Sequence, residues 1–219
     1  MNSRKFILKN LQNAAPKIRQ TNLPTMADAE LFNQTETDTQ KQLNQFRQKL
    51  EMLNGEFILV KSETEAAKKI KQIVESENGT WLIQPDIFSD PECKNILPQS
   101  TGMDLDNSQF AKYDFGISRA DFLIARTGSV VLNSVSGGGR RLSVLPPAHI
   151  VVAEQKQLLP SLDFAFELMQ KTEGNWSFAT IISGPSRTSD IEKQLVLGAH
   201  GPKRLIVILI KNYSFTLGL

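Results

Sequence analysis

The sequence predicts an α/β fold with a mostly parallel, Rossmann-like sheet, helices on both faces and a β insertion. Short apolar runs alternate with helical stretches of roughly 10–15 residues, which is typical of βαβ units. Residues 129–153 break this rhythm, because two strand-like runs follow each other without a helix between them. With 219 residues, we expect one domain over 39–219, preceded by an N-terminal arm over 1–38.

The first half of the predicted domain alternates helix and strand. Four apolar residues at helical spacing predict a helix: Leu43, Phe46, Leu50 and Leu53. Asn54 and Gly55 are expected to end it. This stripe covers only about two heptads, so packing on the domain's own sheet is favoured over a coiled coil. Strands are predicted over 56–60 and 80–83. Ser62 and Glu65 form a capping box for a helix between these strands.

The second half contains most of the predicted strands. We expect them over 113–117, 129–132, 149–153, 180–182 and 205–210, with 120–125 either a strand or a short helix. A short helix is predicted over 91–96, and another around Leu162, Phe166 and Met169. A last helix is predicted after Ser189, which with Glu192 resembles a capping box, and it would end at Gly198.

Composition limits the kinds of function. The net charge is +2, from 25 basic and 23 acidic residues, which does not indicate a nucleic-acid-binding protein. No apolar run is long enough for a membrane span. The single cysteine, Cys93, is expected to be a surface thiol, and one cysteine cannot form an internal disulfide or an iron–sulfur site. We therefore expect a cytoplasmic protein with no metal and no cofactor.

Loops that combine glycine, arginine and hydroxyl residues are the main functional signal. Glycine lets backbone N–H groups approach an oxyanion, and arginine adds a planar charged fork. Ligands of parallel sheets bind beyond the carboxyl ends of the strands, so we expect these loops to meet there around a carboxylate or phosphate. The candidate ligand-binding residues are Arg126, Thr127, Gly128, Gly138, Gly139, Arg140, Gly184, Ser186, Arg187, Thr188 and His200.

Each of these loops also has a purely structural interpretation. Residues 126–128 can be a turn with a solvated arginine, and the three glycines at 137–139 a flexible hairpin. Ser189 and Asp190 can simply cap a helix. The glycine loop lacks the lysine of a Walker loop and the spacing of a dinucleotide fingerprint. His149 and His200 are compatible with structural roles, and no catalytic residue is identified.

Four segments together resemble the lactate utilization protein C family, the LUD-domain proteins: ARTGSVVL (125–132), GGGRRLSVLPPAHIVV (137–152), SGPSRTSDIE (183–192) and LGAHGPKRLIVIL (197–209). The resemblance implies a fold like that of sugar-phosphate isomerases, glucosamine-phosphate deaminases and CoA transferases. It also implies a role in oxidising lactate to pyruvate beside companion proteins that carry iron–sulfur centres. Many members are expected to have an acid where this chain has Arg126, so no catalytic acid is transferred to that position.

Three functions follow as hypotheses, and whether the chain is itself an enzyme stays open. The first is a component of a lactate-oxidising system, without iron–sulfur centres, that binds a small carboxylate or its companions. The second is an independent enzyme acting on sugar phosphates or CoA esters. Such an isomerase needs a carboxylate base, for which Asp121 and Asp190 are the nearest candidates. The third is an interaction module that docks through its N-terminal arm.

Overall fold

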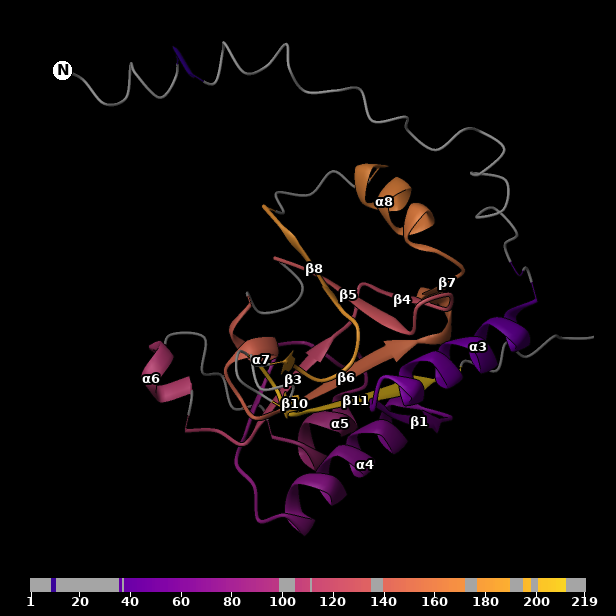
Figure 1. The fold of residues 1–219 in the computed structure, drawn as a ribbon. Coiled ribbons are helices and arrows are strands. Elements are labelled where there is room, and N and C mark those ends of the chain that lie inside the picture. Colours follow the sequence, from indigo (N-terminus) through magenta and orange to yellow (C-terminus); the bar gives the residue numbers. More distant parts are fainter. Residues whose placement is uncertain are drawn as a thin grey trace, which may run out of the picture. The chain divides into compact units, whose positions relative to one another are not determined.

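A computed structural model shows the arrangement of the chain (Figure 1). All the elements below lie in one compact unit, Glu36–Leu219. The structure describes residues 9–10, 36, 38–98, 105–110, 112–134, 140–171, 177–189, 195–197 and 201–211.

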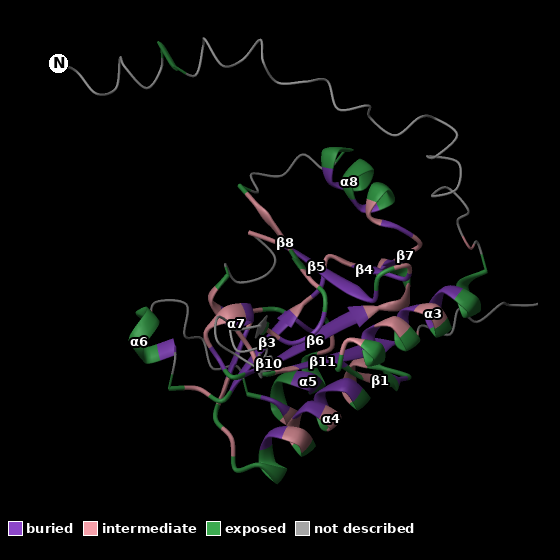
Figure 2. Cartoon of the chain, viewed as in Figure 1, coloured by how far each residue is buried: buried purple, intermediate pink, exposed green. Residues whose placement is uncertain are grey.

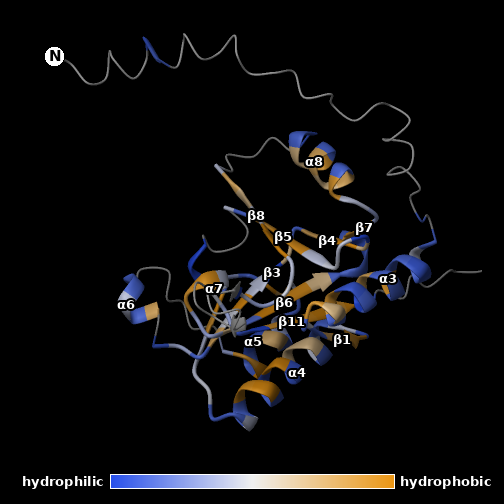
Figure 3. Cartoon of the chain, in the orientation of Figure 1, coloured by the Kyte–Doolittle hydropathy of each residue, from blue (hydrophilic) through white to orange (hydrophobic). Residues whose placement is uncertain are grey.

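A five-stranded parallel sheet forms the centre of this unit. Its strands lie in the order β1 (Glu56–Val60), β11 (Arg204–Ile210), β6 (Ala148–Glu154), β3 (Phe115–Arg119) and β2 (Trp81–Ile83). β11 and β6 are mostly apolar and almost fully buried, as expected for a parallel sheet covered on both faces (Figures 2 and 3). The predicted fold class is therefore confirmed.

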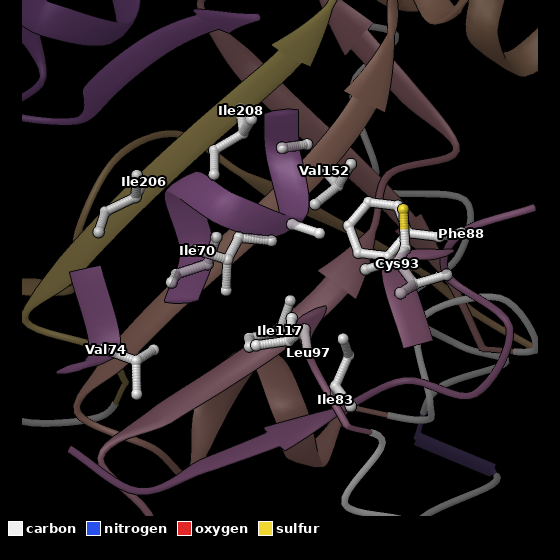
Figure 4. Packing of buried hydrophobic residues seen from close by; sticks show 14 of the residues in the cluster. Ile70, Val74, Ile83, Phe88, Cys93, Leu97, Ile117, Val152, Ile206 and Ile208 are labelled. Carbon is white, nitrogen blue, oxygen red and sulfur yellow. The ribbon is translucent and has the colours of Figure 1, made fainter. Parts of the chain in front are cut away.

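Two helices cover one face of this sheet: α4 (Glu63–Ser76) and α5 (Pro91–Ile96). Ile70 and Val74 of α4 pack against Ile206 and Ile208 of β11 in a buried apolar cluster (Figure 4). Cys93 of α5 belongs to the same cluster and is fully buried. The expectation of a surface thiol was wrong, because α5 places this side chain on its apolar face.

The opposite face is covered by α3 (Thr39–Met52) and by a second sheet. Leu43, Phe46 and Leu50 of α3 are buried against Val207 and Leu209 of β11 in one cluster. The helix thus packs on its own sheet, as its short apolar stripe indicated. It ends as predicted, because the Gly55 amide donates to the Leu50 carbonyl and Asn54 has a positive φ of 64°.

The second sheet has four strands, in the order β7 (Leu158–Leu159), β4 (Phe122–Ile124), β5 (Ser129–Asn133) and β8 (Ala179–Ile182). Helix α8 (Leu162–Lys171) packs against it through Ala165 and Met169. This sheet is the predicted β insertion, but its membership differs. Residues 129–133 pair with β4 and β8, whereas 148–154 lie in the parallel sheet, so the two runs are not partners.

Short helical elements complete the described unit. α6 (Asn107–Phe110) and α7 (Arg141–Val144) both precede strands of the parallel sheet, and a 3-10 turn, η2 (Gln155–Gln157), links β6 to β7. The Ser62 hydroxyl accepts the Glu65 amide at the start of α4, as the capping box predicted. The Glu65 carboxylate bonds the Lys61 amide, one residue before the cap.

The helix predicted after Ser189 is wrong. β9 (Arg187–Ser189) and β10 (Leu195–Leu197) form a two-stranded antiparallel sheet instead. Leu195–Leu197, which the capping pattern had placed in a helix, pair with Arg187–Ser189, and the hydrogen bonds between the two strands satisfy backbone N–H and C=O groups there. Asp190 and Glu192 lie outside the described residues.

Candidate functional site

Two of the predicted glycines pack against the end of α3. Gly128 lies in the turn between β4 and β5 with a φ of 65°, and Gly184 follows β8 with a φ of 87°. A Cβ atom on Gly128 would lie 2.4 Å from the Leu50 backbone nitrogen, and one on Gly184 would lie 2.7 Å from the Leu53 carbonyl oxygen. Both positions therefore require glycine for conformation and for close approach of α3.

A short chain of hydroxyl groups joins the same two loops. The Ser129 hydroxyl lies 2.7 Å from the Thr127 hydroxyl and 2.7 Å from the Ser183 hydroxyl. The Arg187 guanidinium donates to the Leu53 carbonyl at the end of α3. The end of a helix carries partial negative charge, so an arginine is favourable there and an anion is not. In this structure Gly128, Gly184 and Arg187 lie against the end of α3, and Thr127 bonds Ser129 beside them.

The later loops also meet. The Ser186 amide donates to the Pro202 carbonyl over 2.8 Å, and the Lys203 amide donates to the Pro147 carbonyl over 2.7 Å. Residues 147 and 203 directly precede β6 and β11, which run parallel. The loops therefore meet at the amino ends of these strands. The prediction that these loops meet at the carboxyl ends of the strands was wrong. Residues 147 and 203 lead into β6 and β11, and a loop that leads into a strand lies at its amino end.

The two consecutive arginines have separate aromatic partners. Arg140 is exposed, and its guanidinium carbon lies 5.5 Å from the centre of the Phe178 ring. Arg141 lies 4.6 Å from the centre of the Phe110 ring and donates to the Leu105 carbonyl over 2.6 Å. Both arginines line a shallow depression between α6 and α7, together with Asn107, Val144 and Leu145. Phe178 precedes β8, at the opposite end of that strand from Ser183 and Gly184.

The structure thus separates the candidate residues into two groups. Thr127, Gly128, Gly184 and Arg187 surround the end of α3, whereas Arg140 lies beside α7. Gly138, Gly139 and His200 fall outside the described residues, and for Thr188 only the backbone is described. Arg126 donates its amide to the Pro160 carbonyl over 3.1 Å.

The carboxyl ends of the parallel strands hold a different polar hollow. Its lining comes from the ends of β6 and β11 and from the segments that follow β1, β2 and β6, and it contains none of the predicted residues. The lining residues are Lys61, Ser62, Glu63, Ser89, Glu154, Lys156 and Ile210. Glu154 is paired with both Arg119 and Lys156. The Glu63 carboxylate accepts two amide hydrogens over 2.7 Å, from Ser89 and Asp90. The acidic groups of this hollow are thus engaged by the fold.

A buried polar pair was missed from the sequence. Ser118 of β3 and His149 of β6 are both fully buried, and the Ser118 hydroxyl lies 2.9 Å from His149 Nε2. His149 Nδ1 has no hydrogen-bond partner among the described residues. Burial lowers the pKa of His149 to about 3, so the imidazole is neutral in the fold. His149 lay in the predicted strand 149–153, whereas Ser118 lies one residue beyond the predicted strand 113–117, so only the histidine carried a signal.

Asp121, the proposed isomerase base, has a structural partner. Its carboxylate accepts the Asn133 amide over 2.6 Å and the Asn133 side-chain amide over 2.9 Å. Those bonds tie the start of β4 to the end of β5. Across the part of the chain that the structure describes, no group of three potential metal ligands occurs. No described helix is long and apolar enough to cross a membrane.

The sequence of the chain matches a known protein family. The LUD domain matches residues 43–210, which include most of α3, all three sheets and the loops described above. The chain belongs to the LUD domain family. A crystal structure of a DUF162 family protein from Deinococcus radiodurans resembles this LUD domain with a TM-score of 0.53 and 19% identity, over 80% of this chain and 99% of that one. This likeness concerns the fold alone.

Curated relatives match a shorter part of this LUD domain chain. The lactate utilization protein C of Halalkalibacterium halodurans is 39% identical over 103 residues, which is 45% of each chain. The protein of the same name from Bacillus subtilis is 33% identical over 101 residues, 44% of this chain and 42% of the relative. An uncharacterized protein of Neisseria meningitidis is 35% identical over 120 residues. The matches span about half the length of these relatives.

Proposed function

We propose that this LUD domain chain is a component of a system that oxidises L-lactate to pyruvate, and that it binds a small carboxylate. The observation that carries the proposal is its similarity to proteins named lactate utilization protein C, up to 39% identical over 103 residues. Oxidation of lactate releases two electrons and two protons, so a redox carrier must take part. A single cysteine cannot ligate an iron–sulfur cluster, so companion proteins supply the electron carriers.

Arg140 is the residue to which we assign carboxylate binding. Its guanidinium stacks on Phe178 and lines the depression beside α7. Stacking uses the face of the guanidinium and leaves the N–H groups at its edge directed outward, where a carboxylate can accept two of them. Arg187, by contrast, already donates to the end of α3.

Calorimetric titration with L-lactate and pyruvate tests this assignment, with neutral lactamide as the matched ligand. Replacement of Arg140 by alanine should weaken carboxylate binding by roughly 10- to 150-fold, the value of a charged hydrogen bond. Arg47→Ala is the control, because Arg47 is exposed on α3 and pairs only with Glu51 among the described residues. Equal binding of lactate and lactamide, or unchanged affinity in Arg140→Ala, would contradict the proposal.

A further inference from the structure

β1 is an apolar strand at the border of the parallel sheet (Figure 1). Its sequence is EFILV, with charge only at Glu56 and at Lys61 beyond its end. Proteins normally protect such edges with lysine, proline, a bulge or a very short strand. β2, at the other border, is protected by its length of three residues, whereas β1 has five. β1 is therefore the less protected edge of this sheet.

The backbone of β1 offers hydrogen bonds on its open side. The Lys211 amide donates to the Val60 carbonyl over 2.8 Å, so Val60 faces β11. Because successive residues of a strand direct their N–H and C=O groups to alternate sides, Phe57 and Leu59 face the open edge. Among the described residues, β1 pairs only with β11. Two amides and two carbonyls can therefore pair with an additional strand.

The side chains beside this edge form a groove. Leu59 is 45% exposed, and Ile58 and Phe57 are only partly buried. The groove between β1 and α4 is lined by Ile58, Leu59, Val60, Glu65, Lys68 and Lys69. An added strand would cover Leu59 on one face of the sheet and Ile58 on the other, because its side chains alternate in the same way.

The charges that line the groove indicate which kind of segment binds there. Two lysines and one glutamate line the groove, and the glutamate already accepts the Lys61 amide. A second copy of this chain would bring its own Lys68 and Lys69 toward these lysines. The first 27 residues of the chain hold five basic residues and no acid, so the lysines of the groove would repel them as they would repel a second copy. Residues 212–219 carry no charged side chain.

We propose that β1 and its groove bind an extended segment of another protein by strand addition, and that apolar and acidic residues alternate in this segment. Backbone hydrogen bonds to Phe57 and Leu59 supply affinity. Lys68 and Lys69 select the acidic side chains. This binding site is independent of the carboxylate site at Arg140, which lies beside α7.

Fluorescence anisotropy of the full chain with labelled nine-residue peptides tests the proposal. The probe alternates valine and glutamate. One matched peptide replaces glutamate by lysine, and another carries N-methyl groups on its valines, which removes the donors needed for strand addition. The acidic probe should bind saturably and more weakly as salt rises, and both matched peptides should bind at least about tenfold more weakly.

Variants of the chain test the same site from the other side. Leu59→Pro removes an amide on the open edge and should reduce binding of the acidic probe by about tenfold or more. Lys68→Glu with Lys69→Glu should reverse the preference in favour of the lysine peptide. Lys71→Glu is the control, because Lys71 lies on α4 outside the groove and pairs with Glu75.

Four outcomes would overturn the proposal. They are no saturable binding at millimolar probe, equal binding of the N-methylated peptide, equal binding of the lysine peptide, and self-association of the chain that Leu59→Pro abolishes. The last would identify a second copy as the occupant. The N-methylated peptide leaves the protein unchanged, so it decides the question even if Leu59→Pro fails to fold.

Discussion

Among the described residues, His149 has a charge state that depends strongly on the fold. It lies in the middle strand β6, bonded at Nε2 to Ser118 and without a described partner at Nδ1. A charged imidazole there would have no solvent and no anion to stabilise it. The pKa of about 3 in the fold follows from burial, against an ordinary value of 6.5.

This difference predicts how stability depends on pH. Well above pH 6.5 the imidazole is neutral in both states, so it adds no pH dependence there. Below pH 6.5 only the unfolded chain takes up the proton, so the free energy of unfolding falls as the pH falls. The slope should approach about 1.4 kcal/mol per pH unit near pH 5, measured by urea denaturation at a series of pH values.

Two variants separate His149 from other titrating groups. His149→Gln should be less stable than the wild type at pH 8 but should lose this slope between pH 6.5 and 5. His200→Gln, which replaces the second of the two histidines, should keep it. The explanation fails if the slope persists in His149→Gln.

At the scale of elements, the docking of α3 explains several of the glycine and hydroxyl residues. The turn at Gly128 and the loop at Gly184 both lie against the last turn of α3, and Arg187 bonds its terminal carbonyl. Three elements distant in sequence are thus joined at one helix end. The pattern that suggested anion binding serves a helix terminus here, since backbone carbonyls also need donors.

Gly128→Ala tests this docking. Alanine at a φ of 65° is strained, and its Cβ atom would lie 2.4 Å from the Leu50 nitrogen and 2.7 Å from the Lys49 carbonyl carbon. We expect the free energy of unfolding to fall by at least about 2 kcal/mol, measured by chemical denaturation. Gly201→Ala is the matched control, because its Cβ atom would meet only the Ser186 side chain, at 3.2 Å. A loss of similar size in both variants would contradict the interpretation.

Local patterns predicted most of the elements. The apolar spacing of α3, the Ser62 cap of α4 and the apolar runs of β1, β6 and β11 each depend on a few neighbouring residues, and the structure confirms them. Ser189 and Glu192 also matched a helix start, yet Ser189 pairs with Leu195 in a hairpin. Short cap patterns occur by chance, and here pairing with β10 favours a β-strand over a helix at Ser189.

At the scale of the whole molecule, the side of the sheet on which a loop lies could not be predicted from residue types. The loops at Pro147 and Pro202 lead into β6 and β11, so their place at the amino ends follows once those strands are known to be parallel. The division of strands between two sheets also depends on long-range pairing. Residues 129–133 and 148–154 look alike in sequence, but only the second run enters the parallel sheet.

For the whole molecule, the proposed function predicts a binding role for this chain and a redox role for its companion proteins. In that proposal Arg140 binds the carboxylate, and the single cysteine, which is buried in α5, cannot ligate a cluster. Purified chain should therefore form no pyruvate from L-lactate with a dye acceptor, and it should become active only when iron–sulfur companion proteins are added. Arg140→Ala should then lower the rate of the reconstituted system, whereas Arg47→Ala should not. Robust oxidation by the isolated chain without any added cofactor would show that it carries the redox chemistry itself.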